Sequence, residues 1–157
     1  MTLRNTTRSW GSVTKSLHWL IVLLIIVQWA VVQYAGSLPL SAKGPPLNLH
    51  KSIGMTILAL AIVRLVWRIS NPVPSLSGLA KGWEHTLARI SHVLLYALLL
   101  AMPLTGWLMS SARNFPVSWF GQFQFPDLVS PSRPLYERLH DLHETLFAVL
   151  VVVAMLH

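Results

Sequence analysis

Residues 16–42, SLHWLIVLLIIVQWAVVQYAGSLPLSA, contain no charged side chain. Three further stretches also lack Lys, Arg, Asp and Glu, at residues 52–63, 90–112 and 145–157. Because a helix needs about 20 apolar residues to cross the hydrocarbon core of a bilayer, these stretches predict four membrane-spanning helices. The helices are expected near residues 17–36, 50–69, 89–110 and 138–157.

The composition agrees with a membrane protein of one domain. Hydrophobic residues make up 54% of the 157 residues and charged residues only 11%, which is too apolar for a soluble domain of this size. Four helices with modest connections form one bundle, so we predict an all-α integral membrane domain over residues 1–157. A secretory signal peptide is disfavoured because the first apolar run is long, has no clear cleavage site and carries His18.

Proline and glycine mark the three connections, at residues 36–48, 70–82 and 111–137. The third connection is the longest and combines its prolines with several aromatic residues. Aromatic side chains favour the headgroup region of a bilayer. We therefore expect this connection to form a flap that lies on the outer membrane surface.

Basic residues predict the orientation of the helices. The N-terminal tail and the second connection with its flanks carry seven Lys and Arg, and the other side carries five. The seven are Arg4, Arg8, Lys15, Arg64, Arg68, Lys81 and Arg89, and the five are Lys43, Lys51, Arg113, Arg133 and Arg138. Because Lys and Arg accumulate on the cytoplasmic side, both termini are predicted to be cytoplasmic. Topology thus accounts for the net charge of +7, and no nucleic-acid partner is expected.

Four of the seven histidines lie on the predicted spans, where ionisable residues are costly and usually functional. His143 and His157 are 14 residues apart, which on a helix is about 21 Å of rise and nearly four full turns. Both therefore project from almost the same face, at two depths. His50 begins the second span at the depth of His143, and His18 begins the first span at the depth of His157. These depths predict the pairs His50/His143 (outer) and His18/His157 (inner).

Two histidine pairs at two depths predict that the bundle encloses two bis-histidine b-type haems. Imidazole on both faces closes the iron to other ligands and suits one-electron transfer. The sequence has no cysteine, which excludes covalent c-type haem, disulfides and Cys-bound zinc. Gly54, one turn past His50, is predicted to let a flat macrocycle approach the backbone. Arg64, which is 14 residues beyond His50, is predicted to pair with a propionate of the inner haem.

Several of these assignments have alternatives. His140 lies one turn before His143 and is an alternative ligand, although it faces about 60° away from His157 on a regular helix. His92, at the inner end of the third span, is a candidate contact for a propionate or a quinone, or else an ordinary interfacial histidine. Arg64 is alternatively a basic anchor that reaches toward the cytoplasmic surface.

Around these residues the sequence resembles the bacterial cytochrome b561 family of four-helix, di-haem, quinone-linked membrane cytochromes. The matching stretches are SLHWL at 16–20, NLHKSIG at 48–54, VRL at 63–65, SHVLLY at 91–96, MPLTG at 102–106, HET at 143–145 and LH at 156–157. The resemblance covers nearly the whole chain and implies four haem ligands, at His18, His50, His143 and His157. It also implies that the fourth helix continues into a basic cytoplasmic tail, so the sequence is expected to be incomplete at its C-terminus.

The resemblance implies electron transfer across the cytoplasmic (inner) membrane of a bacterium, with membrane lipid and ubiquinone as partners. Some family members look like superoxide oxidases, which pass electrons from superoxide outside the membrane to ubiquinone, and we predict this activity. Outer basic residues such as Lys51 and Arg113 would attract a small anion. Four acidic residues on the same side partly cancel this charge, namely Asp127, Glu137, Asp141 and Glu144.

Other classes of function are less consistent with these residues. The main alternative is a non-catalytic cytochrome b subunit, which relays electrons between quinone and a partner oxidoreductase bound at the third connection. A proton-coupled transporter or metal-binding membrane protein is disfavoured because the histidines pair at two levels and the four uncharged stretches contain no carboxylates. A soluble hydrolase is excluded because no nucleophile, base and acid stand out together.

Overall fold

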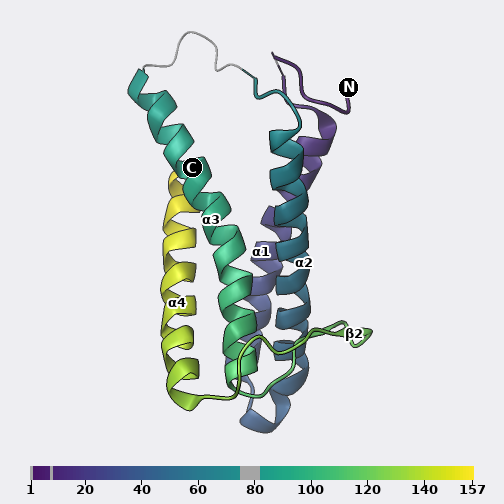
Figure 1. The fold of residues 1–157 in the computed structure, drawn as a ribbon, viewed down its shortest axis with the longest axis vertical. Helices are drawn as coiled ribbons and strands as arrows, with labels where there is room; N and C mark the ends of the chain where they lie inside the picture. Colours follow the sequence, from purple (N-terminus) through teal and green to yellow (C-terminus); the bar gives the residue numbers. More distant parts are fainter. Residues whose placement is uncertain (1, 8, 75–81) are drawn as a thin grey trace.

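The structure, a computed structural model, describes residues 2–7, 9–74 and 82–157 and is dominated by long helices (Figure 1). They are α1 (Ser12–Ser37), α2 (Gly44–Ile69), α3 (Gly82–Ala112) and α4 (Arg133–Leu156). Each of the four is long and apolar enough to cross a membrane. The predicted all-α fold with four membrane-spanning helices is confirmed.

The helices run alternately in opposite directions, so that both termini lie at the same end of the bundle (Figure 1). α1 packs mainly on α2, and α3 packs mainly on α4, while contacts between α2 and α3 join the two pairs. A short 3-10 helix, η1 (Leu40–Ala42), precedes α2. The antiparallel strands β1 (Ser118–Trp119) and β2 (Phe123–Gln124) form a small hairpin far from the termini.

One buried cluster forms a narrow seam between α1, α2 and α3. Its members are Ile21, Ile53, Ile57, Ala61 and Leu99. A second cluster joins Met55 and Leu58 of α2 to Val117 of the third connection. Most other apolar side chains face outward, since only 11% of the most apolar window of α1 and 6% of that of α4 is buried. Lipid tails are as apolar as Leu, so helices in a bilayer have no hydrophobic reason to bury these side chains against one another. The outward-facing apolar surface is therefore what membrane helices require.

All four helices begin five to seven residues earlier than expected, and two of them have prolines in their first turns. α2 begins at Gly44 and α4 begins at Arg133, with Pro45, Pro46 and Pro134 in their first turns. Proline is tolerated there because the first backbone N–H groups of a helix have no intrahelical partner. These prolines start helices, whereas their clustering with glycine suggested loops.

Hydrogen bonds to α2 hold the hairpin in place. The Phe120 backbone N–H donates to Ser52 Oγ at 3.0 Å, and Trp119 Nε1 donates to Thr56 Oγ1 at 3.0 Å. Residues Phe120 and Gly121 have positive φ values of 48° and 74° and form the turn. The hairpin was not predicted, because its strands are only two residues long. Its aromatic side chains Trp119, Phe120 and Phe123 are exposed, and its position on the membrane surface stays a prediction.

Part of the second connection lies outside the described residues. Residues 75–81 include the expected turn residue Gly78 and the basic residue Lys81. Arg8 also lies outside them. The orientation of the bundle, which rests partly on Arg8 and Lys81, therefore stays a prediction.

Candidate functional site

His50 on α2 and His143 on α4 face each other. Their ring centroids are 6.3 Å apart, and the ring planes are inclined by 75°. Because a bond from a His nitrogen to a metal ion is about 2 Å long, two such bonds together with the depth of the two rings span about 6 Å. The separation of the rings thus fits one iron held between His50 and His143.

The alternative ligand His140 is directed elsewhere. Its Nε2 lies 3.7 Å from a carboxylate oxygen of Glu144, and its Nδ1 lies 3.9 Å from one of Asp141. Its ring also lies 5.9 Å from the ring of Tyr136. His140 therefore belongs to a polar cluster on α4, and His143 is the histidine that faces His50.

Thr105 on α3 determines which nitrogen of His143 is available. Thr105 Oγ1 donates its single hydrogen to the Met102 carbonyl oxygen at 2.9 Å and lies 3.0 Å from His143 Nδ1. The Thr105 oxygen therefore accepts a hydrogen bond from His143 Nδ1–H, and Nε2 keeps a free lone pair. A metal-bound His usually donates its other ring N–H in this way, so His143 is prepared to bind a metal through Nε2.

Gly106 provides the space for the His143 ring. A Cβ atom on Gly106 would lie 3.2 Å from His143 Cε1 and 3.7 Å from His143 Nδ1. The first distance is shorter than the optimal separation of about 3.5–4.0 Å between carbon atoms. The missing side chain thus lets α3 approach the candidate ligand on α4.

A Gly106→Val variant is expected to displace the His143 ring and to release the haem that His143 is predicted to bind. The haem-to-protein ratio of the purified protein, measured from the pyridine haemochrome spectrum, should fall, because a ligand moved by even 1 Å cannot hold the metal geometry. Gly36→Val is the matched control, since a Cβ at Gly36 meets no atom within 4 Å. Equal haem content in both variants would contradict this role of Gly106.

Gly54 lies beside a side chain of α1. A Cβ atom on Gly54 would stand 3.3 Å from Gln28 Nε2, which donates to the His50 carbonyl oxygen at 2.9 Å. Gly54 therefore makes room for an amide close to His50. That Gly54 lets a haem macrocycle approach the backbone of α2 stays a prediction.

The other predicted residues gather near the end of the bundle that holds both termini. His92 on α3 and His157 have ring centroids 4.8 Å apart. The Arg64 guanidinium lies 5.5 Å from the centre of the Tyr96 ring. His18 lies in the second turn of α1, the helix that begins at the end of the bundle where the N-terminus lies. These residues lie near one end of the bundle, and the inner pair His18/His157 stays a prediction.

His18 and His157 make no ring contact with each other within the described residues, and the ring nearest to His18 is that of Trp19 at 5.3 Å. His18 Nδ1 and Arg64 Nε are nevertheless buried without a hydrogen-bond partner in this part of the chain. Such atoms are rare in native proteins and call for an explanation. A haem fits both, since its iron binds imidazole and its propionates accept hydrogen bonds from guanidinium groups.

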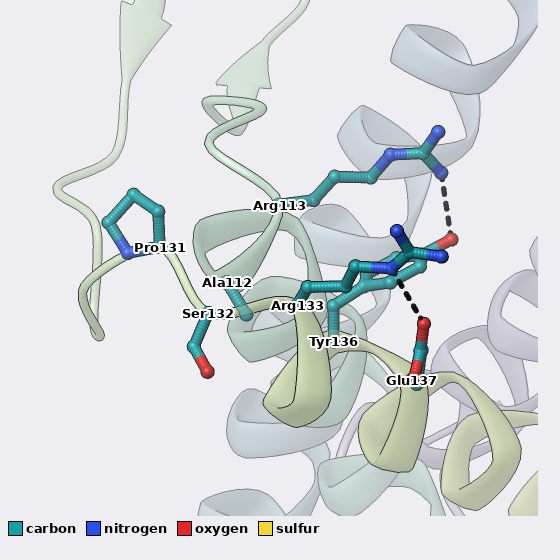
Figure 2. A pocket seen from close by; sticks show the side chains of 7 residues that line it. All are labelled: Ala112, Arg113, Pro131, Ser132, Arg133, Tyr136 and Glu137. Atoms are coloured by element: carbon teal, nitrogen blue, oxygen red, sulfur yellow. Dashed lines mark hydrogen bonds and ion pairs between the residues drawn. The ribbon is translucent and has the colours of Figure 1, made fainter.

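A cavity of about 640 Å³ lies where α3 ends and α4 begins (Figure 2). Arg113 Nη1 donates to the Tyr136 hydroxyl at 2.8 Å, and Arg133 Nε contacts Glu137 Oε1 at 2.9 Å. The Glu137 carboxylate compensates the charge of Arg133. Arg113 has no carboxylate partner among the described residues, so it leaves positive charge at this rim.

Three residues beside the candidate ligands were missed in the sequence: Gln28, Thr105 and Tyr96. Gln28 carries a usable signal, because a polar side chain within a long uncharged run usually faces a partner. Thr105 carries none, since its role depends on the packing of α3 against α4. Tyr96 lies under the guanidinium groups of both Arg64 and Arg68, which no local pattern reveals.

Comparison with known proteins gives consistent matches. The family model "Prokaryotic cytochrome b561" matches residues 9–157. "Cytochrome b561 homolog 2" of Escherichia coli (strain K12) is 29% identical over 161 residues, which cover 100% of this chain and 85% of that protein. "Probable superoxide oxidase CybB" of Yersinia pestis is 30% identical over 90 residues, which cover 57% of this chain and 51% of that protein. "Cytochrome b561 homolog 1" of Escherichia coli is 26% identical over 134 residues, or 82% of this chain and 74% of that protein.

The family match includes all four helices and both groups of histidines. Cytochromes b561 bind b-type haem and transfer electrons in membranes, and the facing pair His50/His143 suits that cofactor. The resemblance noted in the sequence is thereby confirmed. The chain is a multi-pass bacterial membrane protein that belongs to the prokaryotic cytochrome b561 family.

Proposed function

We propose that this cytochrome is a superoxide oxidase of the bacterial cytoplasmic membrane, which passes electrons from superoxide on the outer side to ubiquinone. The facing pair His50/His143 supports the proposal, because two facing imidazoles suit a haem that transfers electrons, and the pair lies at the end of the bundle predicted to face outward. A similar protein bears the name "Probable superoxide oxidase CybB", which supports superoxide as the donor. Arg113, at the same end, would attract the anion.

The proposed reaction balances with two superoxide ions for each quinone. Each superoxide loses one electron and becomes O2, and ubiquinone gains two electrons and two protons to become ubiquinol. A bis-histidine haem supplies one-electron transfer at an iron closed to other ligands. His50 and His143 would hold this haem, and their two imidazoles would leave superoxide no ligand position, so that its electron would pass without a bond to the metal.

We place the second haem at the inner end, between His18 and His157, with Arg64 paired to a propionate. The unpaired buried atoms of His18 and Arg64 support this placement. His92, whose ring touches that of His157, is the candidate contact or proton donor for quinone. Residues 1–157 then form one domain with its N-terminus in the cytoplasm, as the distribution of basic residues supports.

The visible spectrum of the detergent-purified protein, recorded while superoxide is generated, tests this function. Superoxide is expected to reduce the haem b bands rapidly, and a ubiquinone analogue is expected to reoxidise them. Added superoxide dismutase should abolish the reduction, because it removes the donor. Bands that respond only to a chemical reductant would overturn the proposal and favour a relay subunit that needs a partner protein.

A further inference from the structure

Gln28 is a polar residue within the apolar part of α1 that the proposed function does not use. Its Nε2 donates to the His50 carbonyl oxygen on α2 at 2.9 Å. A carbonyl oxygen has two lone pairs, so His50 can accept this hydrogen bond as well as the one within its own helix. Gln28 therefore ties the backbone of a candidate haem ligand to the neighbouring helix.

The sequence of α2 accommodates this contact. Gly54 follows His50 by one turn, and a Cβ atom there would lie only 3.3 Å from Gln28 Nε2. Any larger residue would require the amide to move away from the His50 carbonyl. The glycine thus keeps open the position that the Gln28 amide occupies.

Two polar atoms at this contact are still unpaired. Gln28 Oε1 and His50 Nδ1 are buried and lack a hydrogen-bond partner among the residues described. A metal-bound His usually donates its free ring N–H to an acceptor, as His143 does to Thr105. For His50, the acceptor without a partner at this contact is Gln28 Oε1.

A role in helix packing alone does not explain this arrangement. An amide oxygen without a partner destabilises a protein in apolar surroundings, and an apolar side chain of the same size would pack without that cost. Gln28 also makes its hydrogen bond to His50 itself, and not to one of the many other residues along the α1–α2 interface. The position of Gln28 therefore indicates a role that depends on His50 as a candidate haem ligand.

We propose that Gln28 is a positioning residue for the outer haem: it holds His50 in place and lowers the midpoint potential of that haem. An acceptor for Nδ1–H makes the ligand more basic, which favours the oxidised iron. The dipole of the Gln28 side-chain carbonyl also favours the oxidised iron, and the low local dielectric strengthens this effect. This inference rests on the proposed function in that His50 is taken as an axial ligand.

Redox titration of the holoprotein in detergent tests the proposal with Gln28→Met, which keeps the length of the side chain and removes its polar atoms. One haem should shift to a higher midpoint potential while the other keeps its value. Gln33→Met is the matched control, because Gln33 is an exposed glutamine on the same helix. It should leave both potentials unchanged.

The other outcomes are equally decisive. Loss of one haem from Gln28→Met alone would also support positioning of the ligand, whereas loss of both haems would indicate a general role in folding and overturn the proposal. Unchanged potentials with full haem content would overturn it too. A His50→Ala variant distinguishes failure of the Gln28 proposal from failure of the ligand assignment. If that variant retains both haems, His50 is not a haem ligand.

Discussion

A His50→Ala variant is expected to purify with one haem in place of two and to lose superoxide-dependent quinone reduction. The same result is expected for His143→Ala. Each change removes one of the two axial bonds at the outer site, and alanine offers no replacement ligand. The haem-to-protein ratio from the pyridine haemochrome spectrum measures the loss, and ubiquinol formation under a superoxide source measures the activity.

His85→Ala is the matched control for these variants. His85 also lies in a membrane-spanning helix, α3, but no haem role is assigned to it, so both haems and the activity should persist. Two haems in both His50→Ala and His143→Ala would show that the outer site lies elsewhere. Loss of a haem from His140→Ala but not from His143→Ala would instead transfer the ligand role to His140.

At the inner site, His18→Ala is expected to lose one haem, while His92→Phe keeps both. The rings of His92 and His157 are 4.8 Å apart, which is shorter than the span of about 6 Å that two imidazoles need around a metal. Their contact is therefore not that of two axial ligands. His18, with its buried and unpaired Nδ1, is the better partner for His157.

The His92→Phe variant also tests the quinone contact. It should retain both haems and reduce quinone more slowly than the wild-type protein, because phenylalanine keeps the ring but cannot donate a proton. Normal haem content with an unchanged rate of quinone reduction would remove His92 from the quinone site. A single haem in this variant would instead make His92 the ligand that pairs with His157.

The number of helices and their type could be predicted because hydropathy is a local property of the chain. All four predicted spans lie on helices of the structure, and those helices end close to the predicted positions. The starts of α2 and α4 could not be predicted from proline alone, since proline both breaks helices and occupies their first turns. The β1–β2 hairpin was also missed, because contacts with Ser52 and Thr56 on another element stabilise it.

Some residues of each candidate site could also be predicted from the sequence. The 14-residue spacing of His143 and His157 predicts two depths, and in the structure the His143 ring faces that of His50. The contacts at the inner end could not be predicted in the same way, because the His157 ring lies against His92 and not against His18. Which residues bind haem stays a prediction that the histidine variants will test.

The sequence by itself determined that the chain crosses a membrane four times and carries histidines at two depths, since both follow from apolar length and the rise of a helix. Only the tertiary structure decided how those histidines are held. Gln28 meets His50 across 22 residues of sequence, and Thr105 meets His143 across 38. These contacts depend on which helix faces meet and how closely. No local pattern encodes that choice, because lipid and protein are equally apolar neighbours for most of each helix.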